Sequence, residues 1–150
     1  MVYIILFALN LSCSNSNSLY EKSFSIPDTG WTMNHTLEDS WSPRKPASAD
    51  AVLIHVFHSP EFNYQNLYLT GRIEKDSQSL WADTFSIQLS RPHSGRWLGQ
   101  KQGDSWIVSD TIPLSVQMAQ DENLHFQFSQ FSRERNLSGI EKVVVEVVGR

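Results

Sequence analysis

The sequence predicts an all-β protein built as a two-sheet antiparallel β-sandwich, with a jelly-roll or immunoglobulin-like arrangement of strands. Apolar and polar residues alternate in several short segments, which is typical of strands with one buried and one wet face. The clearest case is the parity shared by Trp81, Phe85, Ile87 and Leu89. No segment keeps the period of a helix for more than about two turns. About eight to ten short strands separated by turn signals therefore favour a sandwich over a barrel.

The first half of the predicted domain contains three candidate strands. Residues 20–26 and 31–38 alternate, and the second segment places His35 on its apolar face, where a packed, hydrogen-bonded histidine is the usual finding. Residues 40–50 contain two prolines and no periodicity, so we expect a loop there. Residues 51–58 are apolar on both parities, which predicts a central strand covered on both faces.

A long hairpin follows this central strand. The segments 64–74 and 80–89 are predicted to pair across the polar connection 75–79. Later strands share apolar side chains at alternate positions and are expected at residues 111–118, 124–128 and 143–147. Pro113 places the first of these at a sheet edge, because proline cannot donate to a strand ladder.

Composition and charge narrow the class of protein. A chain of 150 residues is long enough for one domain with its own core. The formal net charge is -4 and basic residues form no stripe, which argues against nucleic acid as a partner. The single cysteine, Cys13, excludes an intrachain disulfide.

The N-terminus resembles a bacterial lipoprotein signal. The apolar run from Val2 to Leu9 has the length of a signal-peptide core and is far shorter than the ~20 residues that span a bilayer. It ends just before Cys13, where a lipobox places the cysteine that carries lipid. We therefore predict a signal peptide over 1–12, a flexible tether over 13–18 and a single β-sandwich domain over 19–150. The alternative is a buried first strand with a core cysteine.

No catalytic or metal site is predicted. His55 and His58 are three residues apart in a strand, so their side chains point to opposite faces, and zinc needs three or four converging ligands. Neither a glycine-rich phosphate loop nor a nucleophile elbow occurs. Asp104 and Asp110 flank Trp106, but carboxylates in loops are usually only solvated. We expect no enzymatic activity, no metal and no cofactor.

The loop from residue 91 to residue 106 is the expected partner-binding segment. It carries Arg91, Arg96, Trp97 and Trp106, and arginine and tryptophan dominate the binding energy of protein interfaces. Arg133, in a later turn, completes the predicted set.

The tryptophans near loops leave two alternatives open. Trp97 and Trp106 can stack on sugar rings, which would make the protein a glycan binder, or tryptophans can plug the open ends of a sandwich. Of Trp41, Trp97 and Trp106, we expect at least two to serve the core.

Three short motifs occur in order along the chain. They are Tyr64-Gln65-Asn66-Leu67, then Trp97-Leu98-Gly99 with Gly103-Asp104, and last Arg133 with Leu137-x-Gly139-Ile140 before a valine-rich end. In order and spacing they resemble the YxNL, WLGxGxGD and MRxxxLxGI motifs of the gliding motility lipoprotein GldH family of Bacteroidota. The resemblance covers essentially residues 13–148. The chain departs from the family pattern at Lys101, Ser132 and Val144, where glycine, methionine and glycine are common.

The resemblance implies a non-enzymatic cell-envelope lipoprotein that is required for gliding motility. It would act as a structural or assembly component of the gliding machinery, which is linked to type IX secretion. The implied partners are envelope proteins of that machinery, and the membrane through the N-terminal lipid. No acidic run follows Cys13, and such a run often accompanies surface export in this phylum, so we expect the protein to face the periplasm. A glycan-binding envelope lipoprotein is the alternative.

Overall fold

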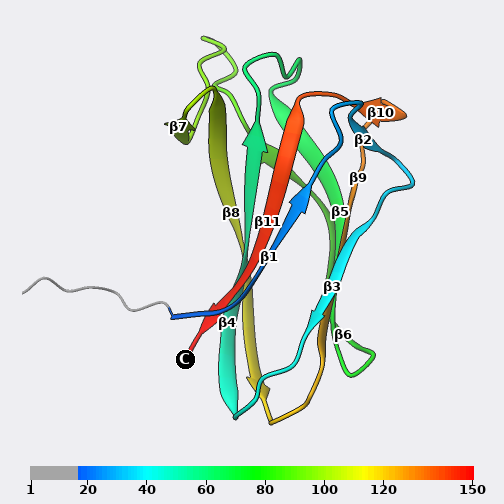
Figure 1. The fold of residues 1–150 in the computed structure, drawn as a ribbon, viewed down its shortest axis with the longest axis vertical. Helices are drawn as coiled ribbons and strands as arrows, with labels where there is room; N and C mark the ends of the chain where they lie inside the picture. Colours follow the sequence, from blue (N-terminus) through cyan, green and yellow to red (C-terminus); the bar gives the residue numbers. More distant parts are fainter. Residues whose placement is uncertain (1–16) are drawn as a thin grey trace, which may run out of the picture.

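The computed structural model describes residues 17–150, which form two antiparallel sheets packed face to face (Figure 1). The prediction of an all-β sandwich is therefore confirmed. Residues 1–16 lie outside the described part of the chain, and with them the predicted signal peptide, Cys13 and most of the tether. Within residues 17–150 no helix is long and apolar enough to cross a membrane.

Two main sheets and a small two-stranded ribbon make up the fold, and every pairing is antiparallel. The five-stranded sheet has the order β1 (Asn17–Ser25), β11 (Ile140–Gly149), β4 (Ala47–His58), β8 (Ser105–Met118) and β7 (Gln100–Gln102). The four-stranded sheet has the order β3 (Leu37–Trp41), β9 (Leu124–Gln130), β5 (Asn66–Lys75) and β6 (Gln78–Gln88). The ribbon pairs β10 (Asn136–Leu137) with β2 (Trp31–Thr32).

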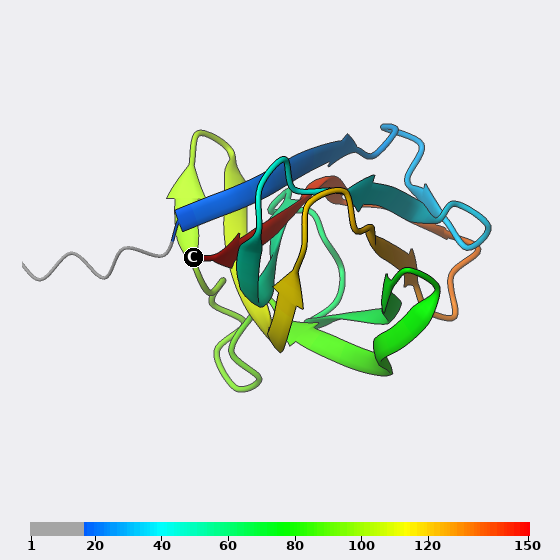
Figure 2. The same ribbon diagram turned by 90° about the horizontal axis from the view of Figure 1, so that it is seen from below.

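The core lies between the two sheets, which form two layers when the molecule is seen from below (Figure 2). Alternate residues of β5 and β9 are fully buried, namely Leu67, Leu69, Ile73, Leu124, Phe126 and Phe128. Gly71 shares this inward parity, and two rings fill the space that a side chain would need there. An added Cβ would lie 2.6 Å from the ring of Phe128 and 2.8 Å from the ring of Trp81. The period of two in the sequence therefore marks the buried face correctly.

The predicted hairpin between the fifth and sixth strands is confirmed. The strands β5 and β6 pair from Asn66 and Gln88 to Lys75 and Gln78. Their connection is only the two-residue turn Asp76-Ser77, shorter than the expected 75–79 segment. Both turn residues have positive φ, 46° and 68°, which is the type I′ geometry that matches the twist of paired strands.

The single strand expected over residues 31–38 is wrong. The chain forms β2, leaves the sheet in an exposed turn and re-enters it as β3, which pairs with β9. The backbone N–H of His35 donates to the carbonyl of Thr32, and the indole of Trp31 donates to the carbonyl of His35. These two bonds stabilise the turn, so His35 is exposed instead of lying on an apolar face. The expected loop over 40–50 shrinks to residues 42–46, because β3 and β4 extend into it.

The central strand predicted over residues 51–58 is β4, which lies between β11 and β8. Its inner residues Val52, Ile54 and Val56 have no exposed surface. Its outer residues, which include Leu53 and Phe57, are only half-buried, so the expected covering of both faces is wrong for the outer face. A two-layer sandwich has no third layer for that face, and side chains of the neighbouring strands shield it only in part.

The strand with Pro113 lies at a sheet edge along most of its length, as predicted. One side of β8 pairs with β4, and the other pairs with β7 only at Ser105, Trp106 and Ile107. Pro113 lies beyond this short pairing, where the side of β8 away from β4 has no partner strand among residues 17–150. A missing N–H on that side breaks no strand pairing.

The two ends of the sandwich carry different parts of the chain. The connections 59–65, 89–104 and 131–139 lie together at the end drawn at the top of Figure 1, which we call the motif end. The first described residue, Asn17, pairs with Gly149 toward the opposite end. Strand pairing thus begins at Asn17, two residues before the domain boundary expected at residue 19.

Candidate functional site

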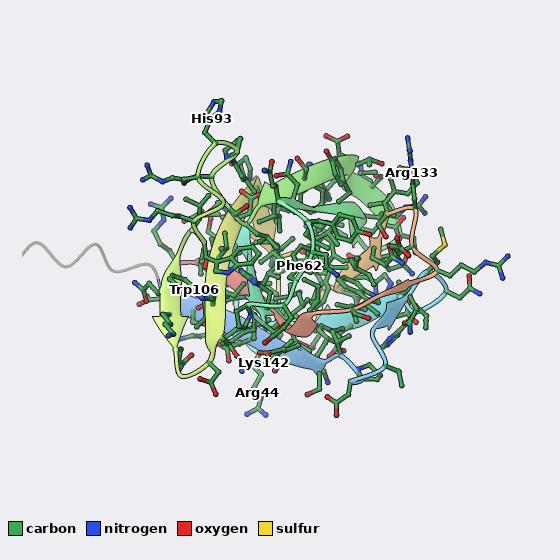
Figure 3. All side chains as sticks on the ribbon, turned by 90° about the horizontal axis from the view of Figure 1, so that it is seen from above. Arg44, Phe62, His93, Trp106, Arg133 and Lys142 are labelled. Atoms are coloured by element: carbon green, nitrogen blue, oxygen red, sulfur yellow. The ribbon has the colours of Figure 1, made fainter. Side chains whose placement is uncertain are left out.

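A row of aromatic rings crosses the motif end and connects the three sequence motifs. The ring of Trp97 meets His58 edge-on at 4.6 Å between centroids, His58 lies 6.0 Å from Phe62, and Phe62 lies 5.7 Å from Tyr64. Phe62 lies near the centre of this end in Figure 3. Gly139 allows the third motif to approach, because an added Cβ would lie 2.9 Å from the Cα of Phe62. The motif end is therefore one packed unit.

His58 is a polar side chain of this unit that has no exposed surface. Its Nδ1 lies 3.0 Å from the carbonyl oxygen of Ser59, while Nε2 has no hydrogen-bond partner among the described residues. Burial lowers the pKa of His58, although the Ser59 carbonyl and the charge of Glu141 act in the opposite direction. The imidazole is therefore neutral, with Nδ1–H donating to Ser59.

The first part of the predicted partner-binding segment is a closed turn that seats Trp97. Ser90 and Trp97 form a β-bridge, and the backbone N–H of Arg91 donates to the carbonyl of Arg96 at 2.9 Å. Both arginine side chains are exposed. The side-chain amide of Gln65 donates to the carbonyl of Pro92 and ties this turn to the first motif. Trp97 itself packs against the core.

Two of the three tryptophans near loops serve the core, as predicted. Trp41 and Trp97 are partly buried and pack against the core cluster. Trp106 pairs with His58 across β4 and β8 and lines a separate cleft of about 300 Å³ that also includes Lys101, Asp104 and Glu141. Within residues 17–150 no ring contact joins Trp97 to Trp106, although Trp106 is the strand partner of His58, whose ring Trp97 contacts.

An open groove of about 980 Å³ lies at the motif end between residues 63–68 and residues 131–137. Three exposed aromatic side chains line it, with exposed fractions of 45% for Tyr64, 48% for Tyr68 and 59% for Phe131. The hydroxyl of Tyr64 donates to Glu134 at 2.7 Å, and this bond raises the pKa of Tyr64.

A buried glutamine holds the wall of this groove. Gln130 is 3% exposed, and its side-chain amide donates to the carbonyl of Glu134 at 2.9 Å. Its Oε1 accepts bonds from the backbone N–H and the hydroxyl of Ser132. These bonds fold residues 131–135 back on the strand end and leave Arg133 exposed beside the groove. The buried parity of Leu124, Phe126 and Phe128 extends to Gln130, a signal that sequence reasoning missed.

The predicted partner-binding residues do not form a single patch. Arg91, Arg96 and Trp97 belong to one turn, Trp106 lies in its own cleft and Arg133 lines the groove. Figure 3 shows His93, from the same turn, and Arg133 on different sides of the motif end. Sequence reasoning missed the exposed rings of Tyr68 and Phe131, which join Arg133 in the groove.

A hydrogen-bonded row on the outer face of the five-stranded sheet was also not foreseen. Nδ1 of His55 lies 2.6 Å from the hydroxyl of Ser109, and Nε2 lies 3.1 Å from the carboxylate of Glu146. Hydroxyl, imidazole and carboxylate follow one another as in the Ser-His-Asp triad of hydrolases. In that triad the hydroxyl lies at Nε2 and the carboxylate at Nδ1, which is the reverse of the arrangement around His55. His58, as predicted, points to the other face. Within residues 17–150 no three His, Cys, Asp or Glu side chains could hold a metal ion together.

Solved structures resemble the chain only distantly. A CocE/NonD family hydrolase from Staphylococcus aureus is 7% identical with a TM-score of 0.40, over 89% of this chain and 37% of that chain. Dimeric latent PorU from Porphyromonas gingivalis is 10% identical with a TM-score of 0.32, over 91% of this chain and 14% of that chain. The VP2 subviral particle of infectious bursal disease virus is 11% identical with a TM-score of 0.33, over 97% of this chain and 37% of that chain. The chain thus spans much less than two thirds of each.

The sequence family is identified more directly. No curated protein matches the chain. The family model described as GldH lipoprotein matches residues 18–147, which is nearly the whole described domain and includes all three motifs. A lipoprotein family is consistent with a lipid-anchored place in the cell envelope. The chain belongs to the GldH lipoprotein family.

Proposed function

We propose that this protein is a non-enzymatic lipoprotein of the cell envelope that acts as a structural or assembly component of the gliding machinery. The match to the GldH lipoprotein family over residues 18–147 carries this proposal. Its partners are envelope proteins of that machinery, which is linked to type IX secretion, and the membrane through lipid on Cys13. The lipid anchor faces the periplasm, in line with the lack of an acidic run after Cys13.

The geometry of the domain supports a docking role at the motif end. Asn17 follows Cys13 by four residues, a length of chain that spans at most about 14 Å. An anchor at Cys13 would hold the end of the sandwich that carries Asn17 and Gly149 close to the bilayer. The motif end would then face away from the membrane, where other envelope proteins can reach it.

Disruption of the gene tests the gliding role. A clean deletion in a gliding host should abolish surface spreading, and a copy of the wild-type gene should restore it. The measurement is colony spreading on agar together with single-cell movement on glass. Normal spreading of the deletion strain would contradict the proposal.

Replacement of the lipid-carrying cysteine tests the anchor. The wild-type protein from its native host should enter the detergent phase on Triton X-114 partition, and a Cys13→Ser variant should remain in the aqueous phase. A wild-type protein found entirely in the aqueous phase would rule out lipidation at Cys13.

A further inference from the structure

We propose that the groove at the motif end binds an extended, acidic peptide segment of an envelope protein. The peptide adds a short strand beside Asn66 and places a carboxylate on Arg133. This inference rests on the proposed function, because it names the docking site and the chemistry of the partner. It stands on the backbone of β5, on one unpaired charge and on three exposed rings.

The backbone of β5 has an unpaired edge in the groove. On the side of β9, its pairing ends at Leu69 and Gln130, followed by one bond of 2.8 Å from the N–H of Phe131 to the carbonyl of Tyr68. The chain then turns away. On the side of β6, the carbonyl of Gln65 accepts the N–H of Leu89 at 2.7 Å.

The direction of these bonds places the main-chain groups of Asn66. Successive residues of an antiparallel strand direct their N–H and C=O groups to opposite sides. The carbonyl of Tyr68 points to the side of β9, and the carbonyl of Gln65 points to the side of β6. The main-chain N–H and C=O of Asn66 therefore also point to the side of β9. No strand in the described part of the chain lies next to Asn66 there. An unpaired edge of this kind is a template for the addition of a strand from another chain.

Charge favours an acidic segment. Arg133 lines the groove, is exposed and forms no ion pair within residues 17–150. The neighbouring carboxylate of Glu134 already accepts the hydroxyl of Tyr64. Glu134 keeps its negative charge, but the guanidinium of Arg133 is the charged group of the groove that has no ion-pair partner within residues 17–150. Its planar set of donors fits a carboxylate through two parallel hydrogen bonds.

The exposed rings supply the apolar part of the site. Tyr64, Tyr68 and Phe131 lie beside the unpaired edge, within reach of the alternate side chains of an added strand. Aromatic residues and arginine are the types that dominate interface energies. A saccharide could use the rings and the guanidinium, but only a peptide brings N–H and C=O groups at the spacing of a strand. The edge at Asn66 therefore favours a peptide.

Binding of defined peptides to the full lipoprotein in detergent tests the site. The probe is a fluorescein-labelled peptide of alternating valine and aspartate with one central tyrosine, and its control is the same peptide with lysine in place of aspartate. We expect the acidic peptide to bind at least tenfold more tightly than the lysine peptide. Hydrogen exchange should show that the acidic peptide protects the backbone amide of Asn66. Equal binding of the two peptides, or an unprotected Asn66 amide, would overturn the proposal.

Charge reversal separates the groove from general electrostatic attraction. Arg133→Glu should weaken binding of the acidic peptide at least tenfold without changing the melting temperature, because Arg133 makes no ion pair in the described chain. Arg44→Glu makes the same change in charge on an exposed loop at the opposite end and should leave binding unchanged. Equal losses in both variants would overturn the site. Binding of trigalacturonate that depends on Arg133, without binding of the peptide, would make the groove a glycan site instead.

Motility distinguishes failure of this inference from failure of the proposed function. If the deletion strain does not spread but the Arg133→Glu strain spreads normally, the gliding role stands. The groove is then overturned as the docking site. Peptide binding that depends on Arg133, in a host whose deletion strain spreads normally, supports the groove and overturns the gliding role.

Discussion

His58 and Trp97 close the interior of the sandwich at the motif end. The two rings meet edge-on at 4.6 Å, and His58 is fully buried behind the indole. Edge-to-face contacts of this kind add to the free energy gained from burial alone. The indole that the sequence placed in a binding loop therefore also contributes to stability.

Truncation of Trp97 tests this role. Trp97→Ala should remove the cover of His58 and lower the free energy of unfolding by about 3 kcal/mol, the lower end of the range for truncation of a buried aromatic residue, because Trp97 is only partly buried. Urea denaturation followed by circular dichroism measures the loss. Arg96→Ala is the control, because its exposed side chain should change stability by less than about 0.5 kcal/mol. A loss for Trp97→Ala no larger than that of the control would contradict the packing role.

Stability should also depend on pH through His58. Burial lowers the pKa of folded His58 below the ordinary value of 6.5, so below pH 6.5 the unfolded chain binds a proton that the folded chain does not. The free energy of unfolding should therefore be constant above about pH 6.5 and decrease below it, by at most ~1.4 kcal/mol per pH unit, until the folded pKa is passed. Urea midpoints between pH 7.5 and pH 5 measure this slope.

A variant without the imidazole provides the control for this slope. His58→Gln should remove most of the decrease between pH 6.5 and pH 5. Asp39 and Glu122 also have lowered pKa values, but their ordinary values of 3.8 and 4.5 place their effect at lower pH. An unchanged slope in His58→Gln would show that another group is responsible.

At the scale of elements, the hairpin of β5 and β6 depends on its turn as much as on its strands. Asp76 is fixed on both sides, because its backbone N–H donates to the carbonyl of Asn123 and its carboxylate accepts the N–H of Asn123. Ser77 has φ of 68° without any such contact. Both turn residues have the left-handed backbone that is unfavourable for a residue with a side chain, and of the two only Ser77 has no hydrogen bond to offset it.

Glycine at this position should stabilise the hairpin. Ser77→Gly creates the Asp-Gly pair preferred in type I′ turns and should raise the free energy of unfolding by about 0.5–1 kcal/mol. Thermal and urea denaturation measure the change. Ser79→Gly, two residues later in β6, should instead lower stability by a similar amount, because glycine weakens a strand. A gain in both variants would show that the turn conformation is not the cause.

At the scale of the whole molecule, the first described strand residue and the three motif segments lie toward opposite ends of the sandwich. The chain enters the domain at Asn17, while the three motif segments converge at the other end. Strand β8 runs between the two ends with 14 residues, a length of about 45 Å at 3.3 Å per residue. Groups at the motif end are thus far from those beside Asn17.

Labels at the two ends test this orientation on a membrane. The protein is anchored on vesicles through Cys13, and a single cysteine introduced by Lys45→Cys or by Ser138→Cys carries a fluorophore. A quencher attached to lipid head groups should act more strongly on the label at residue 45 than on the label at residue 138. The reverse order, or equal quenching, would contradict an orientation with the motif end away from the bilayer.

The sequence by itself determined most of the strands, the buried faces of the clearly alternating ones, and the family. Parity is a local property, because successive side chains of a strand point to opposite sides whatever its neighbours are. Residues such as Ile87 and Leu89 could therefore be assigned to the core, and Arg91 and Arg96 to the surface. The three motifs pointed to the GldH lipoprotein family, and the family match confirmed it.

Only the tertiary structure decided which strands are neighbours and where each strand ends. The groove exists because β5 and β9 pair, which brings Tyr68 next to Phe131 across 63 residues of sequence. The break between β2 and β3, and the meeting of Ser109 with Glu146 around His55, also depend on neighbours distant in the chain. Local alternation shows which face of a strand is buried, but pairing follows from how both sheets pack together, so a site built across strands is absent from any single segment.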